Sequence, residues 1–240
     1  MEFRRLIIII ALVASISGIM TITGTLDKAM AATTLFFANF SNPTWTQVGG
    51  EVTENSLFFP GVVHFNNAAD GGGVYENRVL RHLYSVLPSG NWTADFDYNF
   101  TASSMPAAYP LALTSSKADP EKQGSSGSAI LVYHGANSDI LHLRLWKGST
   151  VSDYPSLTTG ISISPNTQYY VRLAKTSTEL TLSVFSDPAR TNQIPGSPIN
   201  AAISPTDFGN MRFEQHATSQ SSGATRTLTA NVDNLNIYVP

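Results

Sequence analysis

The chain has 240 residues, a formal net charge of −3 and no cysteine, and only 13% of its residues are charged. Without cysteine it has neither disulfides nor thiolate metal sites, and without a basic run a nucleic-acid partner or an anionic membrane surface is disfavoured. The length suits one domain that buries its core without covalent cross-links.

The first 31 residues have the pattern of a secretory signal peptide. Arg4 and Arg5 form a short basic start, residues 6–20 are almost entirely apolar, and Ala29-Met30-Ala31 is a small-x-small cleavage site. The apolar run is shorter than the roughly 20 residues of a membrane span, and we expect no span in residues 32–240. We therefore predict an N-terminal signal helix, cleavage after Ala31, and a secreted or extracellular-surface protein. The alternative is an uncleaved N-terminal anchor.

Period-two alternation, which is typical of β-strands, recurs through residues 32–240. In chain order it is clearest over residues 92–100, 171–174, 180–185 and 228–239. In the last of these the apolar phase changes, which predicts a β-bulge near Asp233-Asn234. Turn signals at residues 88–90, 124–127, 135–137, 164–166 and 186–188 separate the runs. About ten to twelve short strands of this kind predict an all-β sandwich or barrel.

Several of these stretches resemble concanavalin A-like lectin/glucanase domains, in particular a prokaryotic exported subgroup related to laminin-G-like modules. Residues 39–50 resemble the opening strand, residues 92–97 the central strand, residues 163–173 a hairpin entry, residues 180–187 the following strand and residues 232–238 the closing strand. The resemblance implies a jelly-roll β-sandwich of two antiparallel sheets over residues 32–240. It implies no single function, because such domains include lectins, glucanases, adhesion modules and structural proteins.

A hairpin over residues 129–147, with its turn at residues 135–139, is the leading candidate for a binding site. If Tyr133 pairs with Leu141, one face of the hairpin is apolar and the other is mixed. The predicted mixed face consists of Val132, His134, His142, Arg144 and Trp146. An aromatic ring covers the C–H face of a sugar, while histidine and arginine reach its hydroxyls. We predict that His134, His142, Arg144 and Trp146 bind a carbohydrate; the alternative is that Trp146 packs under a loop.

Two further sets of polar residues share a predicted strand face. Glycosidases need two carboxyl groups, and the resemblance implies a Glu-x-Asp-x-Glu strand. The nearest match is Asp95 and Asp97, with Asn99 where a third carboxylate belongs, so we predict no catalytic residue and regard this face as solvated. The second set could bind an anion or a sugar, or form an exposed ion-pair row. It consists of Arg212, Glu214 and His216.

The resemblance also implies a structural calcium ion that clamps the first and last strands. Asp233, beside Asn234, stands at the end position, and Asn39 stands where an aspartate is usual, which weakens a site that needs six to eight oxygen ligands. The five histidines have no zinc-ligand spacing. Asn39, Asn91 and Asn99 each begin an Asn-x-Ser/Thr sequon and are candidate glycosylation sites.

These observations favour an exported, non-catalytic module that binds a carbohydrate or another cell-surface ligand. Two alternatives stay open. One is a structural surface protein or adhesin without a small ligand, which the low charge and the many serine and threonine residues fit equally well. The other is a glycoside hydrolase or lyase with a degenerate site at Asp95 and Asp97, and it is the less favoured of the two.

Overall fold

Sixteen β-strands form the part of the chain that the computed structural model describes. That part comprises residues 33–38, 46–48, 52–55, 62–69, 78–83, 86–101, 107–118, 120, 123–136, 138–155, 159–218 and 227–240. The predicted signal helix over residues 1–31 lies outside it, so cleavage and export stay predictions. Among the described residues there is no helix with the length and apolar character needed to cross a membrane.

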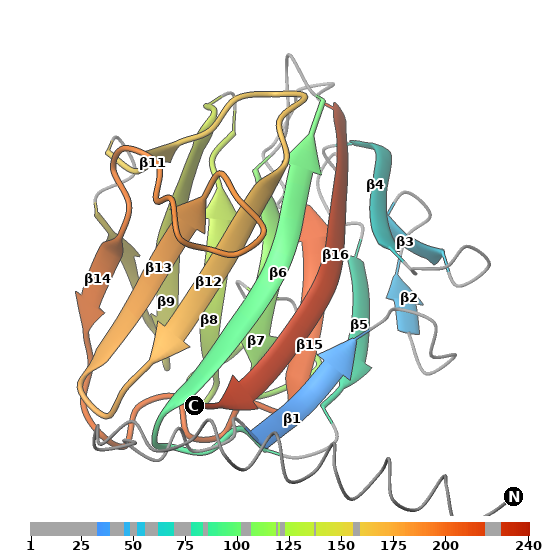
Figure 1. The fold of residues 1–240 in the computed structure, drawn as a ribbon. Coiled ribbons are helices and arrows are strands. Elements are labelled where there is room, and N and C mark those ends of the chain that lie inside the picture. Colours follow the sequence, from blue (N-terminus) through green and yellow to red (C-terminus); the bar gives the residue numbers. More distant parts are fainter. Residues whose placement is uncertain are drawn as a thin grey trace, which may run out of the picture. The chain divides into compact units, whose positions relative to one another are not determined.

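Sheet A contains the described strands nearest both ends of the chain and is the nearer layer in Figure 1. Its strand order is β14 (Ile199–Ala202), β13 (Glu179–Phe185), β12 (Tyr169–Lys175), β6 (Trp92–Phe100), β16 (Thr227–Val239), β4 (Val62–Ala69) and β3 (Val52–Asn55), and β1 (Thr33–Ala38) also pairs with β16. All of these pairings are antiparallel.

Sheet B lies behind sheet A (Figure 1) and is also antiparallel. Its order is β10 (Thr150–Tyr154), β9 (Ile140–Lys147), β8 (Ser128–His134), β7 (Ala108–Thr114), β15 (Phe213–Thr218), β5 (Arg78–His82) and β2 (Thr46–Val48), and β11 (Ile161–Ser162) also pairs with β9. The predicted all-β sandwich of two antiparallel sheets is confirmed. Strands of two to five residues, such as β11 and β10, are too short to show a period, so the sequence predicted fewer strands.

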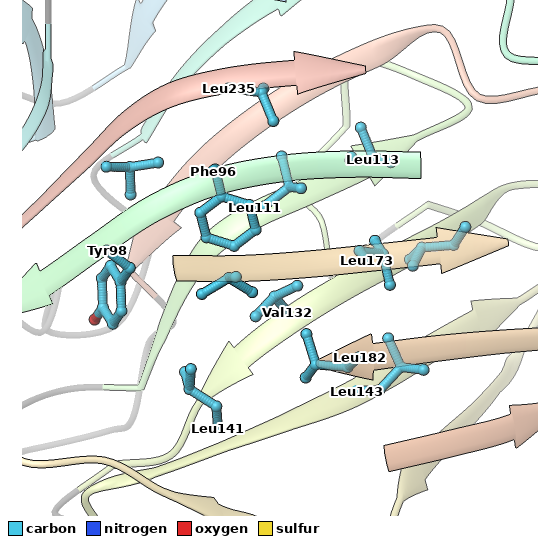
Figure 2. Packing of buried hydrophobic residues seen from close by; sticks show 14 of the residues in the cluster. Phe96, Tyr98, Leu111, Leu113, Val132, Leu141, Leu143, Leu173, Leu182 and Leu235 are labelled. Carbon is cyan, nitrogen blue, oxygen red and sulfur yellow. The ribbon is translucent and has the colours of Figure 1, made fainter. Parts of the chain in front are cut away.

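The core lies between the sheets and is built by alternation along β6. Its residues Trp92, Phe96 and Tyr98 are fully buried and point toward sheet B. Figure 2 shows side chains of β6, β12 and β13 meeting leucine and valine side chains of β7, β8 and β9. Burial of each such side chain contributes about 1.5–3 kcal/mol to the free energy of unfolding, so this layer holds the two sheets together.

The register of β8 differs by one residue from the prediction. Tyr133 pairs with His142, and His134 pairs with Leu141, whereas the predicted partner of Tyr133 was Leu141. A shift of one residue moves every side chain of a strand to the other face. Val132 and His134 therefore face the core, and Tyr133 lies on the outer face. Residues 129–133 are apolar at both odd and even positions, so alternation could not decide between the two faces.

His134 is a core residue that hydrogen-bonds inside the sandwich. The hydroxyl of Tyr98 lies 2.7 Å from His134 Nδ1, and the Phe100 ring meets the imidazole edge-on at 4.6 Å between centroids. Burial lowers the pKa of His134 to about 3 and raises the pKa of Tyr98 above its ordinary value. His134 is therefore uncharged at neutral pH.

Glu214 and His216 form a second polar pair in the core, not the exposed row or ligand face considered from the sequence. Both side chains are fully buried, whereas Arg212 is exposed. His216 Nε2 lies 2.8 Å from Glu214 Oε1, and Nδ1 lies 2.5 Å from the Pro110 carbonyl oxygen. Both ring nitrogens of His216 therefore have a hydrogen-bond partner inside the core, which permits the burial of the imidazole.

The buried His134 predicts a loss of stability in acid. Its pKa is about 3 in the folded chain and about 6.5 in the unfolded chain, so the unfolded state binds more protons between those values. The contribution of this histidine to the free energy of unfolding is fully present above pH 6.5. It falls as the pH drops toward 3, by up to about 1.4 kcal/mol per pH unit. When the free energy of unfolding is measured in urea across this pH range, it should depend less steeply on pH in His134→Gln than in the unchanged protein.

His82→Gln is the matched control, because His82 is exposed. The free energy of unfolding of this variant should depend on pH as it does in the unchanged protein. If His134→Gln also showed that same pH dependence, His134 would not be the buried neutral group described above.

Candidate functional site

The outer face of sheet B, turned away from the core, carries most of the residues predicted to bind a sugar. The strand register places side chains of β8, β9 and β10 in rows across this face. The rows are Tyr133 beside His142, then Leu131 beside Arg144 and Asp153, then Ala129 beside Trp146 and Val151. We call Tyr133, His142, Arg144, Trp146 and Asp153 the platform.

The Tyr133 ring is the centre of the platform. It stacks on the His142 ring with 5.0 Å between centroids and 23° between planes, and the Tyr109 ring lies 5.6 Å away on its other neighbouring strand. The guanidinium carbon of Arg144 lies 4.1 Å from the Tyr133 centroid, within the range of a cation–π contact. These contacts fix the orientation of a ring that is itself half-buried.

Arg144 is held in place by Asp153 on the neighbouring strand. Its Nε donates a hydrogen bond of 2.6 Å to Asp153 Oδ1, and a terminal nitrogen lies 3.5 Å from Oδ2. The two side chains are 12% and 20% exposed, so the pair is largely shielded from water. The pair supplies both hydrogen-bond donors and acceptors beside the Tyr133 ring.

His142 lies deeper than the rest of the platform and is buried. Burial is the main cause that lowers its pKa to about 4; the charge of Arg144 also lowers it, and that of Asp153 raises it. Neither of its ring nitrogens, nor Trp146 Nε1, has a hydrogen-bond partner among the described residues. A buried polar group without a partner costs about 1–3 kcal/mol, so the indole N–H is a donor that a ligand oxygen would satisfy.

Three of the four predicted sugar-binding residues thus lie together on one face, namely His142, Arg144 and Trp146. His134 points the other way, into the core, because of the register of β8. Tyr133 and Asp153 were missed. A signal for Asp153 was present, because the Gly148-Ser149 dipeptide is a two-residue hairpin turn, with Gly148 at φ +60°, that brings β10 back along β9.

Asp95 and Asp97 lie on the opposite side of the molecule, on the outer face of sheet A. Asp95 accepts hydrogen bonds of 2.8 Å from Arg172 at both carboxylate oxygens. Asp97 accepts bonds from Arg190 at 3.0 Å and from Asn234 at 2.8 Å. Burial raises the pKa of Asp97, and Asn234 and Arg190 partly offset that rise. The two aspartates therefore belong to an ion-pair network, and the expected solvated strand face is wrong.

Asn99 and Asn91 differ as glycosylation candidates. The Asn99 amide donates to Gln168 at 2.8 Å, and its oxygen accepts from Asn231 at 2.9 Å, so a glycan would break existing bonds. Asn91 is exposed. Asn39 lies outside the described residues, and all three sequons stay predictions.

Only one of the two predicted calcium ligands, Asp233, lies in the described part of the chain, because Asn39 lies outside it. Asp233 Oδ1 accepts a hydrogen bond of 2.7 Å from the backbone N–H of Asn234. In the described part of the chain, no three histidine, aspartate or glutamate residues are grouped so that they could hold a metal ion. Calcium binding through Asp233 and Asn39 therefore stays a prediction.

The sequence matches no family model and no curated protein. Among solved structures, the globular domain of T. cruzi calreticulin is 9% identical, with a TM-score of 0.55, and covers 85% of this chain and 87% of its own. The exoplasmic/lumenal domain of VIP36 in its Ca2+/Man2-bound form is 10% identical, with a TM-score of 0.52, and covers 82% of both chains. The CBM2 module of the evolved Dit protein of Lactobacillus casei BL23 phage J-1 is 11% identical, with a TM-score of 0.51, and covers 87% of this chain and 96% of its own. The fold is the concanavalin A-like jelly roll.

The expected concanavalin A-like fold is thus confirmed, and it is a fold shared with lectins and carbohydrate-binding modules. At identities of 9–11% the likeness shows the jelly roll and no function. The prokaryotic exported subgroup stays a prediction. Within the described part of this jelly roll, the strand register brings three of the predicted ligand-binding residues, His142, Arg144 and Trp146, together on the platform.

Gly160 packs against His142 of the platform, and we predict that this position does not tolerate a side chain. A Cβ atom there would lie 2.3 Å from Ile140 Cγ2, 2.5 Å from the Leu141 carbonyl oxygen and 3.0 Å from His142 Nδ1. Gly160→Ala should therefore lower the free energy of unfolding by about 1–3 kcal/mol.

Gly90→Ala is the matched control, because a Cβ atom at Gly90 meets nothing within 4 Å. Its effect should be about 0.5 kcal/mol or less. Equal stabilities for the two variants, measured by urea unfolding, would show that residue 160 does not pack as described.

Proposed function

We propose that the chain is an exported, non-catalytic module that binds a carbohydrate on the platform of sheet B. The observation that carries this function is the half-buried Tyr133 ring, which stacks on His142 and contacts the Arg144 guanidinium on the outer face of sheet B. A pyranose ring has an apolar C–H face and a rim of hydroxyls, which an aromatic ring and an adjacent ion pair match.

The remaining groups of the platform fit the same ligand. Trp146 is half-buried beside the exposed Val151, which extends the apolar surface along β9 and β10. The Trp146 indole N–H supplies a donor, and the Arg144–Asp153 pair supplies donors and acceptors without net charge. A neutral sugar therefore matches the platform better than a charged ligand.

The structural relatives support this function by analogy. The VIP36 domain is described as binding Ca2+ and mannose, and the phage J-1 relative is described as a carbohydrate-binding module. Export is supported by residues 1–31, which have the sequence pattern of a signal peptide.

A glycan array tests the proposed function. We expect the purified protein to bind a subset of neutral glycans, and Trp146→Ala and Arg144→Met to weaken that binding by about tenfold or more. Val86→Ala is the control, because Val86 is an exposed apolar residue outside the platform. Circular dichroism should show that all variants stay folded. Unchanged binding in Trp146→Ala would remove the platform as the site.

The same array, repeated with calcium and with a chelator, separates the remaining possibilities. Binding that needs calcium and is lost in Asp233→Ala would support the predicted structural ion. Binding that ignores the chelator would keep the sugar site and reject the metal. A blank array, together with ordered self-assembly in light scattering, would favour the structural or adhesin alternative.

A further inference from the structure

A second pocket lies on the outer face of sheet A, on the other side of the sandwich from the platform. Its volume is about 300 Å³, at the lower end of the range for small-ligand sites. Strands β6, β12 and β16 form its floor, and the turn that follows β13 forms one wall. The lining side chains on which its chemistry depends are Asp95, Asp97, Tyr170, Arg190, Asn234 and Asn236.

The bulge in β16 shapes one side of this pocket. Asp233 pairs with Asp97 and Asn236 pairs with Asp95, so β16 has one residue more than β6 over this stretch. The extra residue gives Asn234 a φ of +54°, and its amide donates to Asp97 Oδ2 at 2.8 Å. A bulge re-aims side chains in this way, and here it turns an amide of the last strand toward the aspartates.

The turn after β13 supplies the other side. The Asp187 carboxylate accepts hydrogen bonds from the backbone N–H groups of Thr191 and Asn192, at 3.1 and 2.6 Å, which fixes the turn. Arg190, at φ +54°, reaches back over the sheet and donates to Asp97 at 3.0 Å. Its Nε lies 3.8 Å from Asp95 Oδ2.

Two buried polar atoms of the pocket have no hydrogen-bond partner among the described residues. They are Arg190 Nε, a donor, and Asn236 Oδ1, an acceptor. The charges of Asp95 and Asp97 are balanced by Arg190, which also lines the pocket, and by Arg172, which pairs with Asp95 beside it. A ligand that satisfies both atoms must both accept and donate hydrogen bonds, and it needs no charge of its own.

We propose that this pocket binds a single neutral sugar residue, as a second carbohydrate site independent of the platform. Each sugar hydroxyl both donates and accepts, so a pair of adjacent hydroxyls can bond Asn236 Oδ1 and Arg190 Nε together. The Tyr170 ring lines the pocket, lies 5.8 Å from the Arg190 guanidinium carbon and offers an aromatic surface to the apolar C–H groups. An anion is disfavoured by the two aspartates, and a cation by the two arginines.

Side-chain NMR of the isotope-labelled protein tests this site directly. D-mannose, D-galactose and D-glucose are titrated separately, and the Arg190 Nε–H and Asn236 side-chain amide signals are followed. At least one sugar should shift the Arg190 Nε–H signal saturably, and Asn236→Ala should weaken that binding by about tenfold. Asn200→Ala is the matched control, because Asn200 is exposed on β14 beyond the pocket, and it should leave the titration unchanged.

The outcomes separate this site from the platform. Trp146→Ala should leave the Arg190 titration unchanged, whatever it does to glycan-array binding. If Asn236→Ala does not fold, Tyr170→Val should weaken the binding instead. The second site is rejected if none of the three sugars shifts the Arg190 signal, or if sodium sulfate shifts it equally, which would make the pocket an anion site.

Discussion

Strand β6 is the element on which both faces of sheet A depend. It pairs with β12 on one side and with β16 on the other, and every second side chain along it is fully buried. The buried set, which includes Trp92 and Phe96, fills the space between the sheets. The alternate set, which includes Asp95 and Asp97, stands on the outer face. Because a strand alternates strictly, the packing of the inner set also fixes where the outer polar groups lie.

The outer faces of the two sheets offer different chemistry within one fold. On sheet B, aromatic rings and one ion pair form the platform around Tyr133. On sheet A, two ion pairs and two amides surround a small pocket. The core between them contains polar side chains that hydrogen-bond to each other, such as Tyr98 with His134. Neither site therefore needs to disturb the packing that holds the sandwich together.

Alternation in the sequence was sufficient to predict which face of a strand is buried wherever one face is apolar and the other is polar. This applies to β6, β12 and β13, and the change of apolar phase in β16 correctly predicted its bulge. It failed in β8, where Ile130 and Leu131 are both buried although they face opposite sides. The face of such a strand is decided by its register with the neighbouring strand, which one sequence does not contain.

Polar residues in the core were the other source of error. In β15, the pattern around Glu214 and His216 is that of a polar outer face, but the two side chains bond each other and are buried. A hydrogen bond between neighbouring polar groups can reverse the ordinary preference for water, and composition does not reveal it. Three of the platform residues could be predicted from their residue types and their positions on one strand. The place of Tyr133 and Asp153 on the platform depends on the pairing of β8, β9 and β10, which the sequence alone does not give.

On one side of the sandwich, sheet A ends at β14 and sheet B ends at β10. The outer backbone groups of these two strands have no neighbouring strand among the described residues. Such edges are templates on which another chain can add a strand and start aggregation. Here the edges are only four and five residues long, and Pro198 directly precedes β14 while Pro155 directly follows β10. Proline has no backbone N–H to donate, so each edge offers an incoming strand a short and interrupted ladder. The jelly roll thereby discourages edge-to-edge polymerisation on this side without any charged edge residue on β14.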